Sequence, residues 1–229
     1  MRNRMKIENK IVTIYASDSN KSNKIPVIIY NSYRDNGKEL WDTCKKIGCK
    51  DFILIVIQDI EWNDEMTPYP ISPIFKSDKG YKGEANSYLD SLTQKIIPEI
   101  IKEKNIIPEY FCISGYSLGG LFSIYSMFKT NIFTRFVSCS GSLWYPGFIH
   151  YVYNHKMIVN PSKIYLSLGD KEKNTKNKII STVEAKTLEL NKYFLSLDLT
   201  TKFEFNVGNH FQDANERVAR GIKWIMESK

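Results

Sequence analysis

The chain has 229 residues, a formal net charge of +7 and a hydrophobic fraction of 42%. This length suits one α/β domain, and the apolar fraction is too high for a disordered chain. The positive charge is scattered among acidic residues and no nucleic-acid-reading module is found, so we expect no nucleic-acid partner. We predict a single domain over residues 1–229 and leave its oligomeric state open.

The sequence also bears on the compartment. Residues 1–10 are polar and basic, without the apolar stretch of a secretory signal. The longest strongly apolar run, 52–57, is far shorter than a membrane span. The four cysteines show no CxxC spacing, which disfavours a disulfide framework. We therefore predict a cytoplasmic protein with no membrane partner.

Short β-branched runs alternate with helical patterns along the chain, which predicts a mostly parallel central sheet with helices on both faces. Pro98 falls inside a helical stripe that begins at Leu89 and should break or kink that helix. A proline-rich, aromatic segment over 58–85 is predicted to be a long loop that forms part of a pocket wall. The predicted strands are residues 11–15, 26–30, 52–57, 110–114, 135–139, 163–168 and 202–207.

The strongest motif is Gly-Tyr-Ser-Leu-Gly at 115–119, directly between a predicted strand and a predicted helix. It matches G-x-S-x-G, the nucleophile elbow of α/β hydrolases, in which the serine occupies a sharp, strained turn. We predict that Ser117 is the nucleophile. The backbone N–H of Leu118, at the start of the following helix, is a candidate oxyanion donor.

A serine hydroxyl needs a base, and the chain has three histidines. His210 lies between the last predicted strand and the C-terminal helix, where this fold carries its catalytic histidine. The acid should follow a strand between Ser117 and His210, and both Asp170 and Glu172 follow the strand over 163–168. We favour Glu172, because its longer side chain can reach back from a loop, and keep Asp170 as the alternative.

Four segments in combination resemble the serine esterase family that includes enterochelin esterase-like and feruloyl esterase-like proteins. The resemblance implies an α/β-hydrolase fold, metal-independent ester cleavage, a serine-acid-histidine triad and an acid at the position of Glu172. The segments are Gly-Tyr-Ser-Leu-Gly-Gly-Leu-Phe at 115–122, Ser-Gly-Ser-Leu-Trp-Tyr at 140–145, Leu-Gly-Asp-Lys-Glu at 168–172 and Gly-Asn-His-Phe at 208–211.

The chain departs from these relatives after its second predicted strand, where they carry a His-Gly-type oxyanion loop and this chain has Tyr-Asn-Ser-Tyr at 30–33. The backbone N–H of Ser32 or Tyr33 is the predicted second oxyanion donor. Four aromatic residues are the candidate substrate-binding side chains, namely Tyr116, Trp144, Trp62 and Tyr69.

The motifs predict a serine hydrolase that cleaves a small-molecule carboxylic ester through an acyl-enzyme. No metal-ligand, P-loop or dinucleotide motif is found, so we expect neither a metal nor another cofactor. Two alternatives stay open. An acyltransferase would use the same triad with an alcohol in place of water, and an inactive binding protein would keep only the fold.

Overall fold

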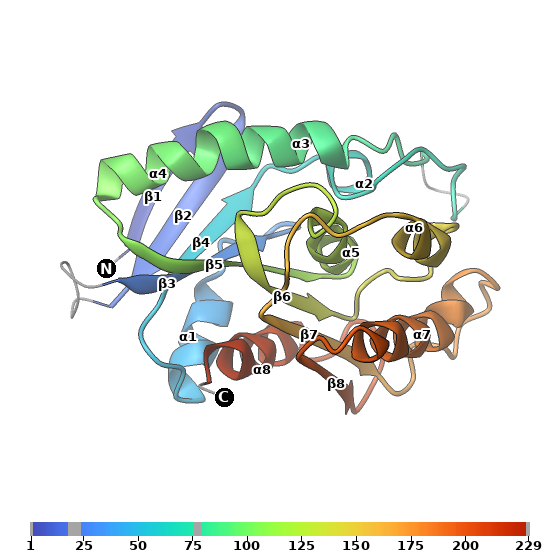
Figure 1. Ribbon diagram of the computed structural model, residues 1–229. Coiled ribbons are helices and arrows are strands. Elements are labelled where there is room, and N and C mark those ends of the chain that lie inside the picture. Colours follow the sequence, from blue (N-terminus) through green and yellow to red (C-terminus); the bar gives the residue numbers. More distant parts are fainter. Residues whose placement is uncertain (1, 18–23, 76–78, 228–229) are drawn as a thin grey trace.

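The computed structural model describes residues 2–17, 24–75 and 79–227. Its centre is an eight-stranded sheet in the order β1-β2-β4-β3-β5-β6-β7-β8 (Figure 1). The β1–β2 and β2–β4 pairs are antiparallel, and all the others are parallel. The strands are β1 Arg2–Ile7, β2 Lys10–Ala16, β3 Ile25–Asn31, β4 Ile53–Gln58, β5 Pro108–Tyr116, β6 Phe133–Cys139, β7 Lys163–Gly169 and β8 Thr201–Asn206.

All seven predicted strands are found, with bounds that differ by no more than two residues. The strand that sequence reasoning missed is β1, whose residues Arg2, Arg4 and Lys6 are exposed while Ile7 is buried. Charged side chains on an outer strand protect its open edge from pairing with other chains. Their presence made the N-terminal segment look like an unstructured polar end.

Helices cover both faces of the sheet, as predicted. Buried side chains of α1 and α8 form one apolar cluster, and those of α3, α4, α5, α6 and α7 form the other. Figure 1 shows α1 and α8 side by side on one side of the sheet, with α3 and α4 on the opposite side. The helices are α1 Lys38–Lys46, α2 Trp62–Glu65, α3 Ala85–Ser91, α4 Ile97–Lys104, α5 Leu118–Ser126, α6 Phe148–Asn154, α7 Val183–Ser196 and α8 Ala214–Met226, with a short η2 at Ile180–Thr182. None of these helices combines the length and apolar character needed to cross a membrane.

Pro98 interrupts the regular α-helix, as predicted, but the chain stays helical on both sides of it. A π-helical turn, η1 Leu92–Ile96, joins α3 to α4, and Pro98 lies in the first turn of α4. Proline has no N–H and its ring clashes with the carbonyl four residues earlier, so a wider turn before it relieves the clash. The apolar stripe stays continuous, since Leu89, Leu92 and Ile96 are all buried.

The segment over 58–85 is less irregular than its prolines suggested. It contains α2, and Ile71 pairs with Tyr81 in an isolated antiparallel bridge. The N–H of Glu84 also donates to the carbonyl of Asp64 at 2.8 Å, which brings the two ends of the segment together. Residues 76–78 lie outside the described part of the chain.

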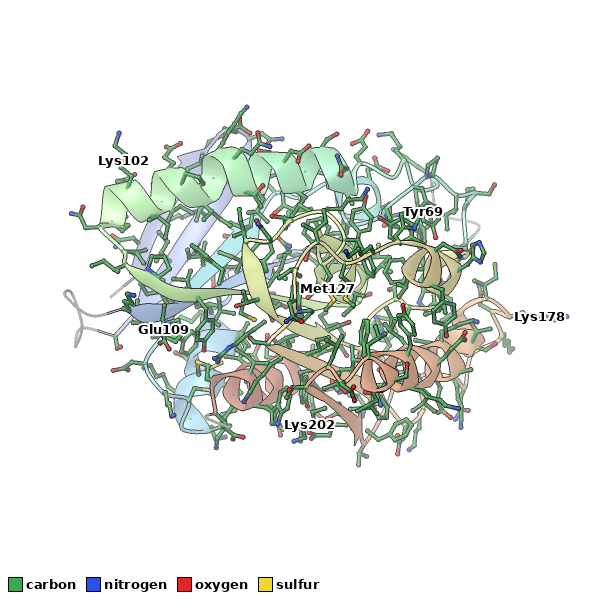
Figure 2. All side chains as sticks on the ribbon, in the orientation of Figure 1. Tyr69, Lys102, Glu109, Met127, Lys178 and Lys202 are labelled. Atoms are coloured by element: carbon green, nitrogen blue, oxygen red, sulfur yellow. The ribbon has the colours of Figure 1, made fainter. Side chains whose placement is uncertain are left out.

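The parallel strands bring the predicted site residues to one edge of the sheet. Strands β3, β5, β6, β7 and β8 run in the same direction, so their carboxyl ends lie together. Tyr33, Ser117, Glu172 and His210 all come within four residues of such an end. In Figure 2, Tyr69 lies near α6, on the opposite side of the molecule from Glu109 at the start of β5.

Candidate active site

Ser117 occupies the sharp turn between β5 and α5. Its backbone has φ 58° and ψ −125°, a conformation that side-chain-bearing residues rarely adopt. Gly115 makes the turn possible, because a methyl group there would lie 2.2 Å from the backbone of Gly119. The strand, the strained serine and the helix together have the form of a nucleophile elbow.

Backbone hydrogen bonds hold this strained turn. The N–H of Ser117 donates to the carbonyl of Cys139 at 3.2 Å, at the end of β6. The Ser117 carbonyl accepts from the N–H groups of Ser142 at 2.9 Å and Gly120 at 3.0 Å. A neighbouring strand and the loop after it therefore offset the strain at Ser117.

Two hydrogen bonds connect the three residues that the sequence predicted as a triad. His210 Nε2 lies 3.0 Å from Ser117 Oγ, and His210 Nδ1 lies 2.7 Å from Glu172 Oε2. The Glu172 side chain is 2% exposed and that of His210 is 30% exposed. The acid is thus enclosed in protein, whereas the imidazole reaches the surface where a substrate could bind.

The second carboxylate oxygen of Glu172 is also fully used. Glu172 Oε1 accepts from Ser140 Oγ at 2.6 Å, from the Gly169 N–H at 2.7 Å and from Arg217 Nη1 at 3.0 Å. Burial favours the protonated acid, but hydrogen bonds from His210, Ser140 and Gly169 outweigh it and lower the pKa of Glu172. Glu172 is therefore a carboxylate at neutral pH.

Asp170 has a different set of contacts. Its Oδ1 accepts from the N–H of Gly208 at 2.8 Å, and its own N–H donates to the carbonyl of Asn206 at 2.8 Å. It therefore ties the end of β7 to the segment that leads into His210. Of the two candidate acids, Glu172 is the one whose carboxylate contacts the imidazole.

The predicted oxyanion donors differ in whether their backbone N–H groups already have a hydrogen-bond partner. Leu118 begins α5, and N–H groups in the first turn of a helix have no partner within that helix. The N–H of Ser32 instead donates to the carbonyl of Ile57 at 2.9 Å, which extends the β3–β4 pairing by one residue. Ser32 is therefore wrong as a donor in this conformation. The Tyr33 N–H donates to no group in residues 2–17, 24–75 and 79–227, so it stays a candidate.

The Tyr116 hydroxyl contacts the histidine loop and Arg217. It donates to the carbonyl of His210 at 2.8 Å and accepts from Arg217 Nη1 at 3.2 Å. Burial raises the pKa of Tyr116 to about 12, so the hydroxyl keeps its proton and stays a donor. With both hydrogen-bonding directions occupied, the Tyr116 hydroxyl supports the histidine loop, and substrate binding by the ring stays a prediction.

Trp62 lies against the elbow helix, and Tyr69 lies further along the same segment. A methyl group on Gly119 would be 3.1 Å from the Trp62 ring, and the Tyr33 ring is 5.3 Å from it between centroids. Tyr69 donates from its hydroxyl to the carbonyl of Pro146 at 2.9 Å. Trp144 is half-buried beside Tyr145. Among the candidate aromatic residues outside the elbow, Trp62 is thus the one that packs against the elbow helix.

A surface hollow of about 530 Å³ lies close to the histidine but does not include it. Phe211, Asp213 and Glu216 line one side, and Glu39 and Lys46 of α1 line the other. Ser117 and His210 are absent from its walls. We do not assign this hollow to the substrate, because catalysis requires the scissile bond to touch both residues.

Arg217 and Ser140 are the contacts of Glu172 that sequence reasoning missed. Ser140 begins the Ser-Gly-Ser-Leu-Trp-Tyr segment that carries part of the family resemblance. Arg217 directly precedes the buried stripe of α8 that begins at Val218. The spacing itself indicates that Arg217 is buried, because residues four apart lie on the same face of a helix and Gly221 stands four residues after Arg217. A methyl group on Gly221 would lie 2.6 Å from Val137, so this face packs closely on the sheet.

Comparisons with known proteins identify the family of this chain. The family model described as "Putative esterase" matches residues 4–194, a range that includes Ser117 and Glu172 and ends before His210. The chain belongs to this esterase family. The family shows that the protein is a carboxylic-ester hydrolase, and it confirms the resemblance on which that expectation rested.

Individual relatives of this esterase are distant. An uncharacterized protein, YbbA of Bacillus subtilis (strain 168), is 24% identical over 220 residues, covering 92% of this chain and 88% of that protein. A solved IroE-like serine hydrolase from Shewanella oneidensis superposes with a TM-score of 0.82 at 13% identity, over 99% of this chain and 79% of the other. The siderophore hydrolase EstA from Aspergillus nidulans superposes with a TM-score of 0.74 at 14% identity, over 99% and 93%. These superpositions confirm the predicted α/β-hydrolase fold.

Proposed function

We propose that this esterase cleaves a small-molecule ester through an acyl-enzyme on Ser117, with His210 as general base and Glu172 as the acid that orients it. The observation that carries the proposal is the pair of hydrogen bonds that runs from Glu172 through both imidazole nitrogens to Ser117. Because Glu172 accepts at Nδ1, the proton resides there and Nε2 is left free to accept the serine proton.

The reaction follows from this tautomer. His210 Nε2 takes the proton of Ser117 as Oγ attacks the ester carbonyl carbon, and the carbonyl π electrons move onto its oxygen. The backbone N–H groups of Leu118 and Tyr33 are the proposed donors to that oxyanion. Collapse expels the alcohol, which receives the proton from His210. Water, activated by the same imidazole, then releases the carboxylic acid.

The acyl-enzyme proposal is tested by labelling with a serine-directed fluorophosphonate, alongside hydrolysis of p-nitrophenyl esters of graded acyl length. We expect labelling and turnover in the native chain and neither in Ser117→Ala. Ser142→Ala is the matched control, since Ser142 Oγ lies only 3.4 Å from Ser117 Oγ but belongs to a different loop. Labelling that survives Ser117→Ala and disappears in Ser142→Ala would contradict the assignment.

The water step has its own test. Product analysis with a primary alcohol added to the assay separates hydrolysis from acyl transfer. We expect the free acid as the main product. A new ester as the main product would show that an alcohol, not water, accepts the acyl group.

A further inference from the structure

Arg217 is a buried cation at the point where the site-bearing segments meet. Its side chain is 0% exposed, and Nη1 donates to Glu172 Oε1 and to Ser140 Oγ, each at 3.0 Å. Nη2 donates to the carbonyls of Val207 at 3.2 Å and Asn209 at 3.0 Å. Removing a guanidinium from water is costly unless charge pairing and hydrogen bonds compensate. These contacts compensate both terminal nitrogens, whereas Nε is buried without a partner among the described residues.

The same guanidinium holds the loop that carries His210. Four consecutive carbonyls, Val207 to His210, accept hydrogen bonds from groups outside the loop. Arg217 supplies those at Val207 and Asn209, and it also donates to the Tyr116 hydroxyl that bonds the carbonyl of His210. Arg217 thus fixes both ends of the contact between Glu172 and His210.

The packing between Gly169 and Arg217 is close. A methyl group on Gly169 would lie 2.4 Å from the carbonyl oxygen of Gly208, 2.9 Å from Glu172 Oε1 and 3.0 Å from Arg217 Nη1. The glycine of the Leu-Gly-Asp-Lys-Glu segment is therefore required for β7, the histidine loop and Arg217 to approach one another.

We propose that Arg217 is a positioning residue that holds Glu172 and the histidine loop in the geometry in which the imidazole reaches Ser117. The inference rests on the proposed function, because it assigns Arg217 to the triad proposed there. Arg217 contacts neither Ser117 nor the imidazole among its hydrogen bonds, so it acts through Glu172 and the loop.

Charge gives Arg217 a second effect that a purely structural residue would lack. The ionisable groups around this contact are Glu172 and Asp170 after β7, Tyr116 at the end of β5, Cys139 at the end of β6 and Arg217 itself on α8. Arg217 and Glu172 form a neutral pair. Without the guanidinium, the negative charge of Glu172 would act on the imidazole unbalanced, so the pH dependence of kcat/KM should change.

The test uses Arg217→Met, which removes the charge, and Arg217→Lys, which keeps it but loses the planar set of donors. We expect kcat to fall by about 100-fold or more in Arg217→Met and by about 10-fold or more in Arg217→Lys, with KM within about threefold. The acid-side midpoint of the kcat/KM profile should move in Arg217→Met and stay near its native position in Arg217→Lys.

Arg135→Met is the matched control. Arg135 also links the sheet to α8, because its guanidinium donates to the carbonyl of Ile225 and stacks 3.6 Å from the Tyr110 ring centroid. It does so from β6, near the carboxyl end of α8. We expect this variant to lose thermal stability and to keep kcat and the pH profile.

Each outcome bears on a different proposal. If Ser117→Ala keeps the native activity, the proposed function fails. If the native chain is active through Ser117 but Arg217→Met is folded and keeps native kcat and pH profile, the positioning role is overturned. If neither Arg217 variant folds, Tyr116→Phe decides, since it removes only the hydroxyl that joins Arg217 to His210. We then expect kcat to fall about threefold or more at unchanged KM, and an unaltered kcat would refute the inference.

Discussion

Two loops lie on opposite sides of β5, and they are held in very different ways. The loop that carries His210 is fixed by Arg217, Tyr116 and Asp170, three side chains from other elements. The loop after β3 takes most of its side-chain hydrogen bonds from its own residues, and one outside side chain, Tyr15 of β2, donates to the carbonyl of Asn36 at 3.1 Å. Ser32 and Asp35 bond each other, and Asp35 accepts from the Gly37 N–H at 2.6 Å.

The difference corresponds to what each loop has to do. Under the proposed function, general-base catalysis requires His210 to stay within hydrogen-bond reach of Ser117, and small displacements are costly in rate. The β3 loop presents Tyr33, which is 54% exposed, and an exposed loop residue is free to adjust to a ligand. Under the proposed function, the histidine loop holds the general base, and the β3 loop offers the Tyr33 N–H to the oxyanion and an exposed ring to the substrate.

The largest effect is expected at the acid that contacts the histidine. Glu172→Gln keeps the size of the side chain but presents the wrong hydrogen-bonding pattern to Nδ1, so kcat should fall by about 10³-fold to 10⁴-fold. Asp170→Asn retains an oxygen that can accept from the Gly208 N–H, and we expect it to cost about tenfold or less. Steady-state kinetics on both folded variants provides the measurement. A larger loss in Asp170→Asn would reverse the roles of the two acids.

A smaller effect is expected at the proposed oxyanion donor. Tyr33→Pro deletes the backbone N–H, and kcat should fall by about 10²-fold if that group stabilises the oxyanion. Tyr33→Ala keeps the N–H and loses only the ring, so its kcat should stay within about tenfold of the native value. The two variants are compared by kcat on one ester at saturating concentration. Equal losses in both would assign the effect to the ring.

Trp62 should influence binding more than chemistry. Trp62→Ala removes an apolar surface beside the elbow, and we expect KM to rise by about 3-fold to 10-fold with kcat within about twofold. Trp41→Ala is the control, because Trp41 packs with Tyr15 and Phe52 in the apolar cluster on the opposite face of the sheet. A KM change of the same size in Trp41→Ala would mean that the effect of Trp62 is not local.

The smallest effect concerns stability in acid. The folded-state pKa of Glu172 lies below its ordinary value of 4.5, so the stability it contributes is present above that value and is lost as pH falls through the folded-state pKa. Urea unfolding at several pH values from neutral to below 4.5 should therefore show a shallower loss of stability in Glu172→Gln than in the native chain. Equal slopes would mean that Glu172 titrates alike in both states.

Local sequence patterns carried most of the fold prediction. β4 and β7 are nearly continuous apolar runs, and strands of that composition are typical of positions covered on both faces. The outer strand β1 was missed for the opposite reason, because an edge strand has one face and one edge in water and its charged residues hide the alternation. Helix α2 was missed because its four residues are too few to show a periodic pattern.

The sequence by itself determined the elbow, because glycines at 115 and 119 around Ser117 encode a turn whose strain is local to the backbone. It also determined the order of Ser117, Glu172 and His210 along parallel strands that end at one edge. Only the tertiary structure decided that Glu172 rather than Asp170 contacts the imidazole. It also decided that the N–H of Ser32 donates to a strand of the sheet, and that Arg217 joins the acid to the histidine loop. These contacts connect residues far apart in the chain, and their directions depend on how whole elements pack, which no local spacing encodes.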